Sequence, residues 1–188
     1  MALHITGDDD ADRLLTDDPF ALLAGMMLDQ QYPMEQAFRG PATVLERLGT
    51  LDPAAVADAD PEEFAALCAR TPAIHRFPGS MAARMQDLAR AVVEDHGGDA
   101  ARLWEEAEDG ADLLRRLKAL PGFGDQKARI LVALLAKQLD VRPDGWERAA
   151  GDYALEGHRS VADVRDPASL QQVREHKQAL KRAKREAG

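Results

Sequence analysis

The sequence has a single cysteine, Cys68, among its 188 residues. One thiol can neither form an intramolecular disulfide nor supply the four thiolates of an iron–sulfur cluster, so neither is expected. The cysteine usage fits a reducing cytoplasm. No run of about 18 apolar residues occurs, so we expect no membrane-spanning helix. The first ten residues lack the basic and long apolar parts of a signal peptide, which also favours a cytoplasmic location.

Positive charge is also scarce. The chain has 24 Lys and Arg against 33 Asp and Glu, which gives a net charge of -9. This balance weighs against nucleic-acid binding, because phosphate contacts need Lys and Arg. The charges are unevenly distributed, however, with Asp clustered in the first 18 residues and Lys and Arg in residues 174–188. An acidic protein can therefore present cations at one face, although the basic end could also be a solvated helix end.

Strand-like alternation is nearly absent, with one short candidate at residues 3–6. Hydrophobic residues make up 45% of the chain, recur with helical spacing and are enough to form a core. Asp-Pro pairs at positions 18–19, 52–53 and 60–61 are typical helix starts, because Asp caps a helix and Pro fits its first turn. We expect Gly40-Pro41 to end a helix. The predicted fold class is all-α.

The central motif lies at residues 119–128, which read ALPGFGDQKA. Apolar residues with helical spacing lead into it and away from it, which predicts two helices and a short turn over about residues 111–139. Pro121 ends the first helix, because it cannot donate an interior backbone bond. Gly122 and Gly124 leave backbone N–H groups uncovered at the start of the second helix, and such a helix start suits a phosphate. A simple turn inside an all-α protein could use the same residues.

This LPGFG motif, with Ala128 four residues after Gly124, resembles the DNA-binding hairpin of the helix-hairpin-helix (HhH-GPD) DNA glycosylases of base-excision repair. The resemblance extends over roughly residues 20–150 and implies two helical lobes with a cleft between them. Residues 30–135, which include the hairpin, would form one lobe, and residues 1–29 plus 136–188 would form the other. The hairpin residues implied to contact DNA are Gly122, Phe123, Gly124, Gln126 and Lys127.

A second stretch supports the same resemblance. Residues 28–38 read LDQQYPMEQAF and follow an apolar helix that begins near Pro19. In the family, a buried helix ends in one or two glutamines that lie close to DNA and can fill the space left by an extruded base. Gln31 matches that position, and Gln30 is its neighbour. An amide offers donors and acceptors to the orphaned partner base, although a pair of polar residues at a helix end is also an ordinary structural feature.

The resemblance implies a catalytic aspartate about eighteen residues after a fixed hairpin position, which is Gln126 here. The matching residue is Asp144, with Asp140 and Glu147 as nearby alternatives. A carboxylate there would stabilise the positive charge that develops on the sugar as the base departs, and could orient or activate a water. A Gly-Trp pair follows where the family has a hydroxyl residue and a histidine, and Asp144 could instead cap the next helix.

In bifunctional family members, the residue that matches Gln126 is a lysine that attacks the sugar. Glutamine cannot form a Schiff base, so the resemblance implies a monofunctional enzyme without lysine-dependent AP lyase activity. Lys127 would point about 100° away around the helix and approach a phosphate. The family often binds a monovalent cation, K+ or Na+, on hairpin carbonyls, which here would be those of Lys118, Leu120 and Phe123. No other cofactor is expected.

Together these features predict a DNA glycosylase that excises a damaged base from double-stranded DNA by base flipping. An alkylated purine is the favoured substrate, because its positive charge already weakens the glycosidic bond. Aromatic residues are 5% of the chain, and the candidates for stacking on a base are Trp104, Trp146, Tyr32, Phe38 and Phe77. Two alternatives stay open: a non-catalytic helix-hairpin-helix protein that binds DNA or recognises damage, and an all-α protein–protein adaptor. We expect a monomer, associated with the nucleoid if the source is bacterial.

Overall fold

The computed structural model of the chain describes residues 2–188. Within this range the backbone forms α-helices and contains no strand, which confirms the all-α prediction. The helices are α1 (Asp9–Asp17), α2 (Pro19–Leu28), α3 (Met34–Leu48), α4 (Pro53–Asp58), α5 (Pro61–Ala69), α6 (Pro78–His96), α7 (Arg102–Glu105), α8 (Gly110–Lys118), α9 (Asp125–Gln138), α10 (Trp146–Ala150) and α11 (Pro167–Ala187). Two short 3-10 helices, η1 (Gly151–Ala154) and η2 (Val161–Asp163), lie between α10 and α11. None of these helices is both long and apolar enough to cross a membrane.

Helices α2, α4 and α5 begin at the Asp-Pro pairs, as the sequence predicts. The carboxylates of Asp18, Asp52 and Asp60 accept hydrogen bonds from first-turn N–H groups of α2, α4 and α5, and each helix has proline in its first turn. The strand candidate at residues 3–6 is wrong. This segment pairs with a side chain, since the Asp12 carboxylate accepts hydrogen bonds from its backbone N–H groups at 2.9 and 3.0 Å.

The predicted break at Gly40-Pro41 is also wrong, because α3 continues through the proline. Proline removes one hydrogen bond from the helix interior. Packing offsets that loss, since α3 lies against α2 and buries Phe38 before the proline and Val44 after it. Phe38 is therefore a core residue and is not exposed for stacking on a base.

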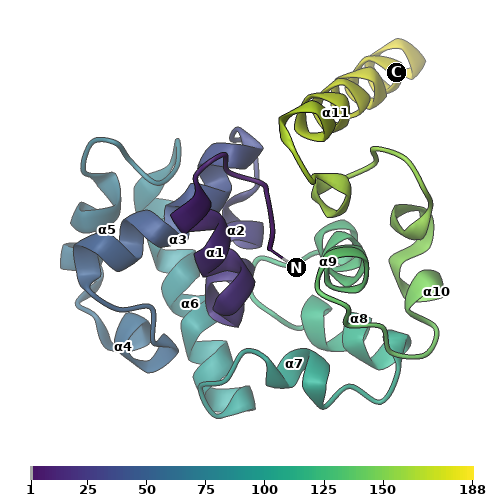
Figure 1. Ribbon diagram of the computed structural model, residues 1–188. Helices are drawn as coiled ribbons and strands as arrows, with labels where there is room; N and C mark the ends of the chain where they lie inside the picture. The colour runs from purple at the N-terminus through teal and green to yellow at the C-terminus, as the bar shows by residue number, and fades with distance from the viewer. Residues whose placement is uncertain (1) are drawn as a thin grey trace.

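Helices α1 to α6 gather on one side of the molecule and α7 to α10 on the other, while α11 projects at the C-terminal end (Figure 1). α2 packs against α3, α6 packs against α4 and α5, and α9 contacts α8, α10 and η2. Buried side chains from both sides belong to one hydrophobic cluster. The division into lobes at residues 30–135 and at 1–29 plus 136–188 stays a prediction.

The predicted hairpin consists of α8, a turn at residues 119–124 and α9, so its two helices are confirmed to within one residue of the expected ends. Gly122 in the turn has φ +82°, a left-handed conformation that side chains rarely adopt. At the other end of α8, a Cβ on Gly110 would lie 2.7 Å from the carbonyl of Gly145. Only glycine permits this approach, which brings the loop before α10 against the start of α8.

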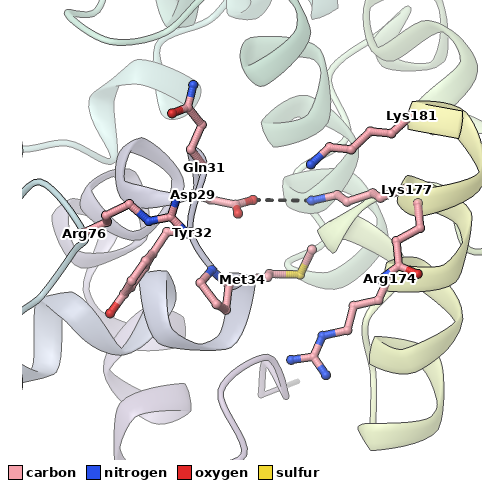
Figure 2. Close-up of a pocket in the computed structure, with 10 residues that line it drawn as sticks. Asp29, Gln31, Tyr32, Met34, Arg76, Arg174, Lys177 and Lys181 are labelled. Atoms are coloured by element: carbon pink, nitrogen blue, oxygen red, sulfur yellow. Dashed lines mark ion pairs between the residues drawn. The ribbon is translucent and has the colours of Figure 1, made fainter. Parts of the chain in front are cut away.

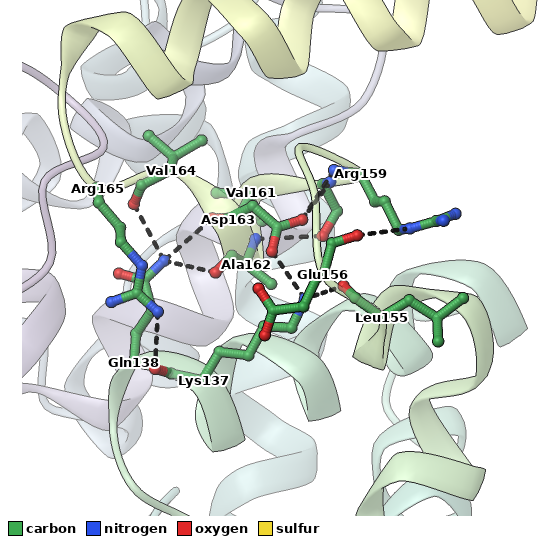
Figure 3. A network of polar contacts seen from close by, with 11 residues as sticks. Lys137, Gln138, Leu155, Glu156, Arg159, Val161, Ala162, Asp163, Val164 and Arg165 are labelled. Carbon is green, nitrogen blue, oxygen red and sulfur yellow. Dashed lines mark hydrogen bonds and ion pairs between the residues drawn. The ribbon is translucent and has the colours of Figure 1, made fainter.

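The chain after α10 is anchored to the end of α9 by a polar network (Figure 3). The amide nitrogen of Gln138 donates to three backbone carbonyls around η2. These carbonyls belong to Val161, Ala162 and Val164 and lie at 3.4, 2.8 and 3.0 Å. The Lys137 ammonium lies 2.7 Å from the Asp163 carboxylate. The network fixes η2 against α9, and α11 begins a few residues later.

Candidate nucleic-acid interface

The glutamine turn, residues 29–33, connects α2 to α3 and is held by a histidine from the α5–α6 loop. The His75 Nε2–H donates to the carbonyl of Gln30 at 2.8 Å, and the His75 Nδ1 accepts from the N–H of Phe77 at 3.0 Å. The ring of Tyr32 packs against the same imidazole with centroids 4.8 Å apart. His75 is 2% exposed, so these contacts fix the turn from inside the protein.

The environment of His75 favours its neutral form. Burial lowers the pKa of His75, and the nearby cations Arg76 and Lys127 lower it further, while its hydrogen bonds to backbone carbonyls act in the opposite direction. A neutral ring suits the geometry, because the Nδ1 atom must keep a lone pair to accept from Phe77. His75 is thus a structural support for the glutamines.

Gln31 is exposed and sits in a left-handed backbone conformation with φ +53°. Few non-glycine residues adopt this conformation, and such residues often lie at functional sites. Gln30 is also exposed, and its amide oxygen accepts from the Arg84 guanidinium at 3.1 Å. Both glutamine side chains therefore lie at the surface, as contact with DNA would require.

The hairpin lies directly against the end of α2. The Lys127 ammonium donates to the carbonyl of Met27 at 3.0 Å, and a Cβ on Gly122 would lie 3.3 Å from the Met27 side chain. Met27 is two residues before Asp29, where the glutamine turn begins. The structure thus brings together the hairpin and the two glutamines, which are about ninety residues apart in the sequence.

The start of α9 presents free backbone donors. Its first intrahelical bond runs from Ala128 N–H to the carbonyl of Gly124, so the N–H groups before Ala128 have no helical partner. No side chain within residues 2–188 caps this helix start. Gly124 is exposed, and no described atom lies within 4 Å of a Cβ built on it. Phe123 is buried, so any contact it makes with DNA would go through its backbone.

Lys127 is only partly available to a phosphate. Its ammonium is turned toward Met27, and burial lowers the pKa of Lys127, while the nearby Asp29 carboxylate opposes that shift. Contact between Lys127 and a phosphate stays a prediction, and it would require this ammonium to turn outward. Gln126 points elsewhere, since its amide nitrogen donates to the Tyr153 hydroxyl at 3.0 Å.

Beside the glutamine turn lies a hollow of about 660 Å³, which we call the cationic hollow (Figure 2). The glutamine turn forms one wall and α11 forms the opposite wall. The lining residues are Asp29, Gln31, Tyr32, Pro33, Met34, Arg76, Arg174, Lys177, Gln178 and Lys181. Four of them are cations, and Figure 2 shows Lys177 and Lys181 reaching from α11 toward Asp29. The hollow therefore offers a positive surface at the predicted DNA-binding face.

Asp144 lies at a different hollow, between α8 and α10. This hollow has a volume of about 510 Å³ and is also lined by Asp109, Lys118 and Arg129. The Asp144 side chain is exposed, and its carbonyl accepts from the N–H of Gly110 at 2.8 Å, at the start of α8. The hairpin turn follows the opposite end of this nine-residue helix, roughly 12 Å away along its axis. The alternatives Asp140 and Glu147 are exposed too.

Two ion pairs of Asp125 close the hairpin turn. Lys118 lies 3.1 Å from Asp125, and Arg129 lies 2.8 Å from the same carboxylate. Of the three carbonyls expected to face a monovalent cation, that of Leu120 accepts the N–H of Phe123 at 3.2 Å. A carbonyl has a second lone pair, so this bond does not prevent the Leu120 carbonyl from also facing a cation, and the cation site stays a prediction.

One residue of this face, Asp29, was not singled out from the sequence. It joins the face through Lys177 of α11, and a periodic pattern cannot report a contact between such distant segments. The contacts of His75 and Arg84 with Gln30 likewise join segments 45 and 54 residues apart. The expected basic end does contribute. Arg174 pairs with Glu35, and Lys177 lies 3.7 Å from Asp29.

Residues 24–186 match the family described as HhH-GPD superfamily base excision DNA repair protein. No curated protein and no solved structure matches the chain. The family match includes the glutamine turn, the hairpin and nearly all of α11, which are the three elements of the candidate interface. The chain therefore belongs to the HhH-GPD superfamily of base excision DNA repair proteins.

Proposed function

We propose that this member of the DNA glycosylase superfamily is a monofunctional N-glycosylase. It extrudes a damaged base from double-stranded DNA and hydrolyses the bond between that base and its deoxyribose. The observation that carries the proposal is the bond between Lys127 and the Met27 carbonyl, because it joins the hairpin to the end of the helix that presents Gln30 and Gln31.

The proposed binding mode follows from this juxtaposition. Phosphates of the duplex approach the uncapped start of α9 at Gly122 and Gly124, where backbone donors and the helix dipole favour an anion. Gln31 enters the space left by the extruded nucleotide. The cationic hollow, a cleft between the glutamine turn and α11, receives the nucleotide itself, and its Lys and Arg side chains hold the flanking phosphates.

An alkylated purine remains the proposed substrate. The cationic hollow has few aromatic surfaces, and Tyr32 is the aromatic side chain among its lining residues. A pocket with little stacking surface binds a normal base weakly. The proposal therefore relies on the bond itself, because a base whose own positive charge has weakened its glycosidic bond departs most readily.

The monofunctional assignment rests on Gln126, whose amide cannot replace a nucleophilic amine. We also propose that the protein works as a monomer in the cytoplasm, on nucleoid DNA if bacterial. It needs no cofactor beyond a K+ or Na+ that the hairpin carbonyls could hold.

A panel of end-labelled duplexes, each with one lesion, tests the proposal. Release of a base by the protein, revealed by strand scission only after alkali, is the expected result for at least one alkylated purine. Duplex binding without base release from any member of the panel would contradict the enzyme assignment. That outcome would instead support the non-catalytic alternative. One observation favours this alternative: Asp144 is exposed and lies at a hollow away from the glutamine turn.

A further inference from the structure

We propose that Asp29 is the catalytic carboxylate of the cationic hollow, in place of Asp144. This inference rests on the proposed glycosylase function and names the residue that faces the reacting sugar. Of the described residues that line the cationic hollow, Asp29 alone is acidic, among four cations and three neutral polar side chains. It also lies two residues from Gln31, the residue proposed to replace the extruded nucleotide.

A carboxylate at the position of Asp29 is unfavourable for the stability of the fold. It is the residue that follows α2, and its N–H closes that helix by donating to the carbonyls of Gly25 and Met26. The C-terminal end of a helix carries partial negative charge, so a carboxylate there is repelled. The Asp29 side chain is only 15% exposed, which limits screening by water. A lysine, asparagine or glycine would suit this end of the helix better.

Two lysines from distant parts of the chain offset the repulsion. Lys177 of α11 lies 3.7 Å from the Asp29 carboxylate, and Lys127 at the start of α9 binds the carbonyl of Met27, two residues before Asp29. A carboxylate at a helix end with two lysines beside it is a preorganised negative charge, held before any substrate arrives. Asp29 destabilises the end of its own helix, and residues from distant parts of the chain compensate for it. Such a combination is expected at a functional site.

The chemistry requires such a charge. When the C1′–N bond breaks, its electron pair leaves with the base, and positive charge spreads over C1′ and the ring oxygen of the sugar. The Asp29 carboxylate stabilises that cation. A water molecule then adds to C1′ and gives up a proton to Asp29 or to solvent, leaving an abasic sugar with a hydroxyl at C1′. An alkylated purine that carries a positive charge leaves as a neutral base and needs no proton.

Asp144 meets these conditions less well. It is exposed at the α8–α10 hollow, and its backbone is bonded to the start of α8, at the far end from the hairpin turn. A nucleotide extruded beside Gln31 enters the cationic hollow, where Asp29 lies and where Asp144 is not among the lining residues.

Single-turnover base release by Asp29→Asn and Asp144→Asn tests the assignment, with the lesion that the wild-type protein releases best. Asp29→Asn is expected to lower the rate by about 100-fold or more, the effect of removing one preorganised charge or donor. Its affinity for the same duplex should stay equal or rise, because the substitution removes a negative charge from a phosphate-binding surface. Asp144→Asn should keep its rate within about threefold. Circular dichroism checks that both variants are folded.

If Asp29→Asn fails to fold because Lys177 loses its partner, the double variant with Asp29→Asn and Lys177→Met removes both charges, and the same loss of rate is expected. An Asp29→Asn rate within threefold of wild type would overturn the assignment, as would a loss of rate confined to Asp144→Asn. Either result leaves the glycosylase function standing. Absence of base release by the wild-type protein overturns that function itself, and the role of Asp29 with it.

Discussion

Lys127 at the start of α9 donates its ammonium to the carbonyl of Met27 at the end of α2, across 3.0 Å. The bond links the hairpin predicted to bind DNA to the glutamine turn, although the two residues are 100 positions apart. A backbone carbonyl near the end of a helix has no intrahelical partner, so the lysine also satisfies the end of α2. One contact thus fixes the spacing between the two elements predicted to hold DNA.

The first prediction concerns this contact. Lys127→Met should lower the free energy of unfolding by about 1.5–3 kcal/mol, the range for a partly buried hydrogen bond to a charged group. It should also weaken duplex binding, because the hairpin and the glutamine turn lose their fixed spacing. Lys118→Met is the matched control, since its ion pair with Asp125 is about half exposed and contributes at most about 1 kcal/mol. Urea unfolding and fluorescence anisotropy at low salt measure the two effects, and equal losses in both variants would argue against the link.

The second prediction separates the two glycines of the hairpin turn. Gly122→Ala should cost about 1–2 kcal/mol of stability, because φ +82° is unfavourable for alanine and Met27 lies against the new methyl group. Gly124 has φ -78° and open space around it, so Gly124→Ala should cost less than about 1 kcal/mol. Its effect should appear in duplex affinity instead, since the methyl group stands where a phosphate would approach. Unchanged affinity in folded Gly124→Ala would place the phosphate elsewhere.

Local features of the fold could be predicted from the sequence because they depend on near neighbours. The caps at Asp18 and Asp60, the glycine turn of the hairpin and the all-α class are of this kind. The continuation of α3 through Pro41 could not be predicted, because it depends on packing against α2. The helix-breaking tendency of a proline is overridden where the burial of side chains contributes more free energy.

The candidate site was predictable in part for the same reason. Gln31 and the hairpin glycines are recognisable from motifs, but the hollow beside them is formed by α11, about 145 residues further along the chain. The pairing of Lys177 with Asp29 joins a residue of α11 and a residue at the end of α2 into one charged site. Lys177 belongs to the basic end noted in the sequence, but Asp29 has no local pattern that marks it, so only the folded chain brings Asp29 forward as a candidate.

The third prediction concerns pH. Burial lowers the pKa of His75 in the folded protein below its ordinary value of 6.5, so the unfolded chain takes up the proton first as the pH falls. The stability that neutral His75 contributes is therefore complete above about pH 6.5 and is lost as the pH falls toward the lowered folded pKa. His75→Phe keeps the ring contact with Tyr32 but cannot titrate. The difference in unfolding free energy between wild type and this variant should narrow from pH 7 to pH 5.

His96 also has a pKa lowered mainly by burial, but it is present in both proteins and cancels from that difference. A difference that stays constant with pH would show that His75 does not titrate in this way.

The fourth prediction concerns α11. Lys181 lines the cationic hollow, whereas Arg182 lies about 100° further around the helix and does not line it. Lys181→Glu should make the slope of log affinity against log salt shallower by about 0.9, the effect of losing one phosphate contact. Arg182→Glu, with the same change of net charge, should alter the slope less. Equal changes would mean that α11 acts only through its overall charge.

The fifth prediction concerns the absence of lyase chemistry. The wild-type protein should leave the abasic strand intact until alkali is added, and borohydride should trap no covalent complex, because Gln126 offers no amine. Gln126→Lys should introduce a trappable complex, since it places an amine at the position that matches the nucleophile of bifunctional relatives. Gln126→Met is the control, because it also breaks the bond to Tyr153 but adds no amine. Lys127, next to Gln126 in the sequence, is an amine that could contradict this result: burial lowers its pKa, but its ammonium is bound to the Met27 carbonyl. A wild-type complex that disappears in Lys127→Met would show that this lysine leaves Met27 to attack the sugar, and the enzyme would then be bifunctional.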